Sequence, residues 1–151
     1  MKRLIVLLAL TSLVLPASAP AATRYYVGKT EQGYRASAKV VDGDLKWIKL
    51  RWWVDCKDSD YTYGPFNDGW YDLPQGPIEQ TGTKFTDSGS GEATLEKPKG
   101  HKVRYSLTLT GAIHKGGVIK ATHRAEARFL NSKGKQYDYC RGSIDMRLKK
   151  R

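Results

Sequence analysis

The chain of 151 residues is poor in the residue types that enzymes use for catalysis and metal binding. It has only two cysteines and three histidines, and no Gly-x-Ser-x-Gly, His-Glu-x-x-His or P-loop sequence. These absences argue against the serine hydrolases, zinc proteases and nucleotide hydrolases that such motifs define. We therefore expect a protein that is not an enzyme, and we assign no catalytic residue, no metal ligand and no cofactor.

The histidines are also badly placed for acid–base chemistry. His101 and His114 begin and end one expected strand, which separates them by roughly 44 Å at ~3.4 Å per residue. His123 falls on the apolar face of the next expected strand. No two histidines are expected to converge, which argues against a two-histidine nuclease. We expect His123 to be a buried core residue with a hydrogen-bond partner.

Long apolar runs are missing as well. The longest, Leu4–Leu15, is shorter than the ~20 residues that a membrane-spanning helix needs. Lys2 and Arg3 precede it and small residues follow it, which is the pattern of a cleaved signal peptide. The sequence therefore predicts a signal peptide at 1–22, a single all-β domain at 23–151, export (extracellular or to the cell envelope) and no membrane span.

Acidic residues are scarce relative to basic ones. The chain has 26 Lys and Arg against 15 Asp and Glu. Without Lys2 and Arg3 the 26 basic residues become 24, which leaves a net charge of +9. Such a charge favours anionic partners such as surface polymers, although it also serves solubility.

The two cysteines are expected to form a disulfide. In an exported protein, Cys56 and Cys140 pair more readily than they serve as free thiols. Closing so long a segment stabilises the fold by roughly 4 kcal/mol in the chain-entropy model.

Alternation of apolar and polar residues predicts strands in the C-terminal half. Residues 101–114, 119–129 and 140–148 alternate with period two and are separated by glycine turns. They predict a three-stranded antiparallel meander. Matching the apolar faces pairs Leu109 with His123 across the first turn and Ala125 with Cys140 across the second.

The N-terminal half predicts further short strands. They lie at 25–27, 35–41, 45–56, 78–85 and 92–96, with a β-bulge at Trp47-Ile48 where the alternation changes phase. Seven or eight strands without a helix predict an antiparallel β-sandwich, with a closed β-barrel as the alternative.

Three short motifs resemble those of uncharacterised small exported bacterial β proteins with a single disulfide. They are the start at 26–33 (Y-V-G-K-T-E-Q-G), the strand ending at 52–56 (W-W-V-D-C) and the late C-R-G at 140–142. The resemblance covers most of the predicted mature chain and implies architecture and export, without an activity.

The segment Lys57–Pro77 departs from that family pattern. It lacks strand alternation and is long for a loop, and long loops are often functional. Aromatic rings beside aspartates suit a saccharide, whose apolar face stacks on rings. The alternative is a cluster of rings that covers a sheet edge. The candidate residues of this aromatic loop are Tyr61, Tyr63, Phe66, Trp70 and Tyr71.

The outward face of the meander is the second candidate site. Its basic residues would form a polyanion platform, and the alternative is an ordinary solvated strand face. It has no interleaved aromatic residues, so stacking of nucleic-acid bases is not expected there. The basic residues are Lys102, Arg104, Lys120, Arg124, Arg128 and Arg147.

These features favour a binding protein. The first hypothesis is an exported, non-catalytic module for an anionic or saccharide surface polymer. The second is a structural or inhibitory module that binds another protein, and the third is a small hydrolase.

Overall fold

The computed structural model describes residues 21–57, 62–71 and 78–151, and for 62–71 it describes the backbone alone. The predicted signal peptide lies almost entirely outside these residues. The described part contains nine strands and no helix. They are β1 (Thr23–Thr30), β2 (Arg35–Val41), β3 (Asp44–Asp55), β4 (Thr62–Tyr71), β5 (Glu79–Thr81), β6 (Lys84–Thr94), β7 (Lys102–His114), β8 (Val118–Leu130) and β9 (Gln136–Lys150).

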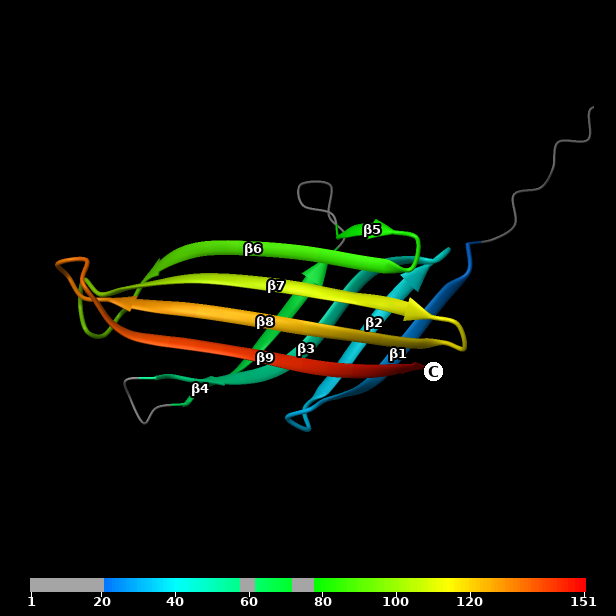
Figure 1. The fold of residues 1–151 in the computed structure, drawn as a ribbon, viewed down its shortest axis with the longest axis horizontal. Helices are drawn as coiled ribbons and strands as arrows, with labels where there is room; N and C mark the ends of the chain where they lie inside the picture. The colour runs from blue at the N-terminus through cyan, green and yellow to red at the C-terminus, as the bar shows by residue number, and fades with distance from the viewer. Residues whose placement is uncertain (1–20, 58–61, 72–77) are drawn as a thin grey trace, which may run out of the picture.

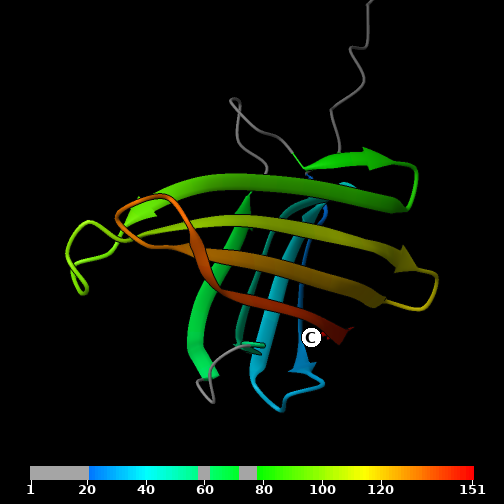
Figure 2. The same cartoon turned by 60° about the vertical axis from the view of Figure 1, so that its left-hand side comes forward.

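The strands form one antiparallel sheet that folds into two layers. Its order is β4-β3-β2-β1-β9-β8-β7-β6-β5, so the first strand pairs with the last. Figures 1 and 2 show β1 to β4 crossing behind β6 to β9. The predicted antiparallel β-sandwich with its C-terminal meander is confirmed. In the described residues, β4 and β5 end the sheet and do not pair with each other.

The turn from one layer to the other occurs where β1 meets β9. Gly28 lies opposite Leu148 in this pairing. A Cβ atom on Gly28 would overlap the carbonyl oxygen of Arg147. The missing side chain therefore lets the two backbones approach closely where the sheet bends.

One hydrophobic core fills the space between the layers. Ile48 on β3, Leu109 on β7 and Ile144 on β9 are fully buried within it. His123 is also fully buried, and its ring centroid lies 4.9 Å from that of Trp52. The expected core position of His123 is confirmed.

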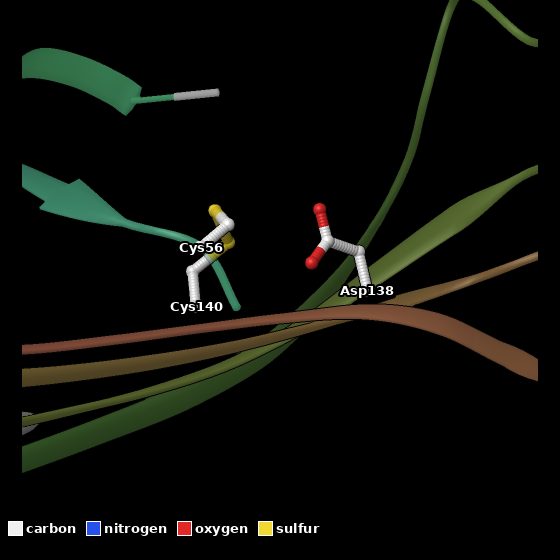
Figure 3. Close-up of side chains that lie close together, drawn as sticks. All are labelled: Cys56, Asp138 and Cys140. Atoms are coloured by element: carbon white, nitrogen blue, oxygen red, sulfur yellow. A yellow bond between two sulfur atoms is a disulfide. The ribbon is translucent and has the colours of Figure 1, made fainter. Parts of the chain in front are cut away.

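The disulfide joins the two layers at one end of the sandwich. Cys56 follows β3 and is bonded to Cys140 on β9, as predicted, and Figure 3 shows the pair. Beside it, the Lys57 amide donates a hydrogen bond to the carbonyl of Tyr139 at 2.9 Å.

A side chain fastens the opposite edge. The Gln80 side chain on β5 accepts a hydrogen bond from the Leu45 amide at 2.8 Å and donates one to the Gly43 carbonyl at 2.8 Å. The shortest strand is thereby held to the turn between β2 and β3. The alternation of apolar and polar residues in this region does not predict the contact of Gln80 with that turn.

The predicted register is correct across the first turn of the meander and wrong across the second. Leu109 pairs with His123 as expected. Ala125 pairs with Gly142, two residues beyond the predicted Cys140. The cause is a longer turn: the Asn131 side chain accepts hydrogen bonds from the Lys133 and Lys135 amides, and a register shift follows Phe129.

Three other strand predictions need correction. The expected bulge exists, but the extra residue lies between Leu45 and Trp47, one position early. The expected strand at 78–85 is two strands with a turn at Gly82. The expected strand at 92–96 is the end of β6, which runs from Lys84.

Candidate polyanion-binding surface

The predicted basic residues all lie exposed on the outer face of the meander, because they alternate with the buried side of each strand. They do not form one cluster. Lys120 and Arg128 are eight positions apart on β8, which is about 27 Å at ~3.4 Å per residue. The six are Lys102, Arg104, Lys120, Arg124, Arg128 and Arg147.

Two of the six contact Glu92 on β6, which offsets one of their two positive charges. Its carboxylate contacts the Lys102 ammonium at 2.5 Å and the Arg104 guanidinium at 2.7 Å. Hydrogen bonds from these two groups hold the pKa of Glu92 below its ordinary value. The positive charge at this end of the predicted basic face is therefore reduced by half.

The middle of the face is also mixed. Glu126 on β8 lies directly opposite Arg141 on β9. Arg128 lies over the Tyr139 ring, 5.9 Å from its centroid. Arg124 lies between Thr108 and Ser143, which are uncharged.

The remaining two residues belong to a row of cations that continues across the bend of the sheet. Lys120 pairs with Arg147, Arg147 with Lys29, and Lys29 with Arg35. These four residues of β8, β9, β1 and β2, which we call the cation row, are all exposed. None of them forms a salt bridge with another residue of the described chain.

Placing four like charges in adjacent cross-strand positions works against folding. Like charges directly opposite each other destabilise a sheet. Two unit charges at such separations repel by about 1 kcal/mol in water before screening by salt. An arrangement that costs stability, in four residues that form no salt bridge within the described chain, favours a ligand that supplies negative charge.

Three of the four residues of the cation row line an open hollow of about 570 Å³ on the outer face. Lys29, Lys120 and Arg147 line it together with the hydroxyls of Thr110 and Thr122. The cationic groups and the Thr110 hydroxyl can donate hydrogen bonds to the oxygens of an anion.

Two carboxylates also line the hollow, those of Glu31 and Asp145. Thr122 donates a hydrogen bond to Asp145 at 2.6 Å. The hollow is therefore positive along the cation row and acidic at its side, so it can orient a ligand that carries hydroxyl or amino groups besides its anions.

Sequence reasoning missed Lys29 and Arg35. Alternation in β1 and β2 already places both side chains on the outer face. The pairing of β1 with β9 has no local sequence signal, however, because it joins the two ends of the described chain. Without that pairing, the row ends at Arg147.

The aromatic segment is not a continuous loop. Residues 62–71 form β4, which pairs antiparallel with β3. The register places Tyr63 opposite Val54, Phe66 opposite Trp52, Trp70 opposite Ile48 and Tyr71 opposite Trp47. Tyr61 lies outside the described residues.

One group of possible metal ligands lies near the disulfide. Figure 3 shows the Asp138 carboxylate beside Cys56 and Cys140, and the ligand atoms of the three lie within 4.8 Å of one another. Metal ions bind the thiolate form of cysteine, and these two sulfur atoms are bonded to each other. The cluster is therefore structural in the oxidised protein. The Tyr139 amide donates a hydrogen bond to Asp138 at 2.8 Å.

The part of the chain that is described contains no helix long and apolar enough to cross a membrane. Comparison of the chain with protein-family models, with curated proteins and with solved structures found no significant match.

Proposed function

We propose that this protein is an exported, non-catalytic binding module that holds an anionic surface polymer along the cation row. The observation that carries the proposal is the direct pairing of Lys120, Arg147, Lys29 and Arg35 on four neighbouring strands. The disulfide is consistent with an oxidising extracellular environment.

The shape of the site favours a polymer over a single ion. The cation row extends over three strand spacings, about 14 Å at ~4.8 Å per strand. Three of its four residues line an open hollow and not an enclosed cavity. Repeating anions can neutralise successive cations of such a row, and each contact releases counterions, so binding weakens steeply with salt.

The first test removes two central charges of the row. We expect Lys29→Gln with Arg147→Gln to weaken binding of inorganic polyphosphate about tenfold at about 50 mM salt. The slope of log affinity against log salt should fall by about 0.7 for each lost phosphate contact. Fluorescence anisotropy of labelled polyphosphate with the oxidised protein measures both quantities.

A matched control removes the same charge elsewhere. Lys133 and Lys135 lie exposed in the turn between β8 and β9, at the far end of the hairpin from Lys120. Lys133→Gln with Lys135→Gln should leave the affinity nearly unchanged. Equal losses in the two variants would mean that net charge alone attracts the polymer, and the proposed row would be wrong.

The alternative ligand is a saccharide, which would bind in the aromatic segment at 57–77. Titration with a neutral dextran distinguishes it, because stacking on rings survives salt that abolishes ionic binding. Saturable dextran binding together with no response to polyphosphate would contradict the cation-row proposal.

A further inference from the structure

The outer face of β1, β2 and β3, together with the turn before β2, carries aromatic rings beside cations. Lys39 lies over the Tyr25 ring at 6.0 Å and Lys49 over the Trp47 ring at 5.2 Å. The Arg51 guanidinium lies 5.3 Å from the centre of the Tyr34 ring. We call these six residues the ring face. They place aromatic rings beside cationic side chains, an arrangement that was not expected on the outer face of the meander.

The register brings two of the rings into one line. Tyr25 pairs with Lys39, and Lys39 pairs with Trp47. The two rings therefore stand two strand spacings apart, about 10 Å at ~4.8 Å per strand. Tyr25 is 50% exposed, and Tyr105 and Tyr137 are the other large exposed hydrophobic side chains of the described residues.

A hollow of about 190 Å³ lies between these rings. Besides Tyr25 and Trp47, its polar lining comes from Arg35, Ser37 and Arg151. No described residue of the lining is acidic. The hollow is thus lined by aromatic residues, two arginines and Ser37.

Arg35 connects the ring face to the cation row. It ends the row opposite Lys29 and also lines the hollow between the rings. A polymer bound along the row can therefore pass directly onto the ring face. The ligand that fits both surfaces has a repeated anion and a flat ring in each unit.

We propose that the ring face and the cation row together bind single-stranded nucleic acid, which specifies the polymer of the proposed function and rests on it. Bases stack on Tyr25 and Trp47, while phosphates pair with Arg35 and the row. Stacking platforms beside basic grooves are the general means by which proteins hold single strands without reading their sequence. A base that stacks on a ring displaces the lysine above it, and that lysine is then beside a phosphate.

The test compares three probes on the oxidised protein. They are oligothymidine of about 15 nucleotides, an abasic strand with the same number of phosphates, and inorganic polyphosphate of similar charge. We expect oligothymidine to bind at least about tenfold more tightly than the abasic strand, and to quench tryptophan fluorescence. The preference should persist from about 50 mM to about 200 mM salt, although both affinities fall.

Variants assign the preference to the ring face. Tyr25→Ala should remove most of the advantage of oligothymidine and leave polyphosphate binding unchanged. Tyr105→Ala is the matched control, because Tyr105 is also exposed, at 40%, but lies on β7. Arg35→Gln, at an exposed position, should weaken the binding of all three probes. Thermal unfolding of each variant checks that it remains folded.

The outcomes separate this inference from the proposed function. Equal binding of all three probes would overturn the ring-face inference and leave polyanion binding intact. Binding of none of them would overturn both. An advantage of oligothymidine that Tyr25→Ala leaves unchanged would also overturn the inference, because the bases would then stack elsewhere.

Discussion

Glu92 shows how one acidic side chain reduces the positive charge of a surface that looks basic in the sequence. Sequence alternation alone places Lys102 and Arg104 on the outer face, where both are indeed exposed. Both cations are nevertheless paired with an acidic group, because the Glu92 carboxylate accepts hydrogen bonds from both. A count of outward cations therefore overstates the positive field at this end of the sheet.

Replacing Glu92 should release those two cations. Lys102 pairs with Leu130, at the opposite end of β8 from Lys120, so we expect Glu92→Gln to create a second polyphosphate site at pH 7 that is separate from the cation row. Its salt slope should be about 0.7 for each phosphate contact. Glu96→Gln, which removes the same charge from an exposed neighbouring turn, is the control. If both variants gain equally, the pairing of Glu92 is irrelevant to binding.

The same carboxylate predicts a pH dependence. The pKa of Glu92 is lowered from its ordinary value of 4.5 by hydrogen bonds from Lys102 and Arg104. The pairs are thus fully formed above pH 4.5 and are lost as the pH falls through the lowered pKa. Binding by the unmodified protein should therefore rise at acidic pH toward that of Glu92→Gln, and the difference between them should vanish.

At the scale of the strands, alternation was a good guide wherever one face is buried. It predicted β2, β7, β8 and most of β9, together with the register of β7 against β8. It missed β4, which contains Pro65 and two glycines; as the last strand of the sheet, β4 has a free side where a proline is tolerated. It shortened β6, in which Phe85 alone is buried, so that most of the strand has no apolar period to read.

The bend between β1 and β9 depends on a glycine. We expect Gly28→Val to destabilise the protein by about 2 kcal/mol or more, because its side chain would overlap backbone atoms of β9 that cannot move aside. A shift in the urea midpoint measures the change. Gly89→Ala on β6 is the control: a Cβ atom there meets nothing within 4 Å, and its effect should be small.

Polymer binding should fail together with this bend. Gly28 is followed directly by Lys29, so a disturbed β1 also moves one cation away from Arg147. A Gly28→Val variant that binds polyphosphate normally would show that the cation row does not need the join between the layers.

At the scale of the whole molecule, the disulfide and the β1–β9 pairing hold the layers together at different places. Cys56 and Cys140 are 84 residues apart in the sequence. The pairing of the cysteines followed from composition and the expected compartment, without knowledge of the fold. The cation row could not be predicted in this way, because its residues come together only when β1 and β9 are neighbours in the fold.

Loss of the disulfide should reduce stability without removing the binding surface. Replacing Cys56 and Cys140 together by serine should cost about 4 kcal/mol, which corresponds to a decrease in Tm of roughly 10–20 °C for a domain of this size. Thermal unfolding measures it. At temperatures where the variant remains folded, polyphosphate affinity should equal that of the oxidised protein, because the cation row lies away from the cysteines.

The neighbouring positions of the first and last strands also set the order in which a newly made chain can mature. Hairpins of β1, β2 and β3 can form as soon as those residues are synthesised. The pairing of β1 with β9, in which Val27 lies opposite Lys149, can form only after β9 has been made. Until then the apolar side of this half, with Ile48 at its centre, has no covering layer. This apolar side is therefore open to chaperones from the time that β1 to β3 are made until Gln136–Lys150 has been synthesised.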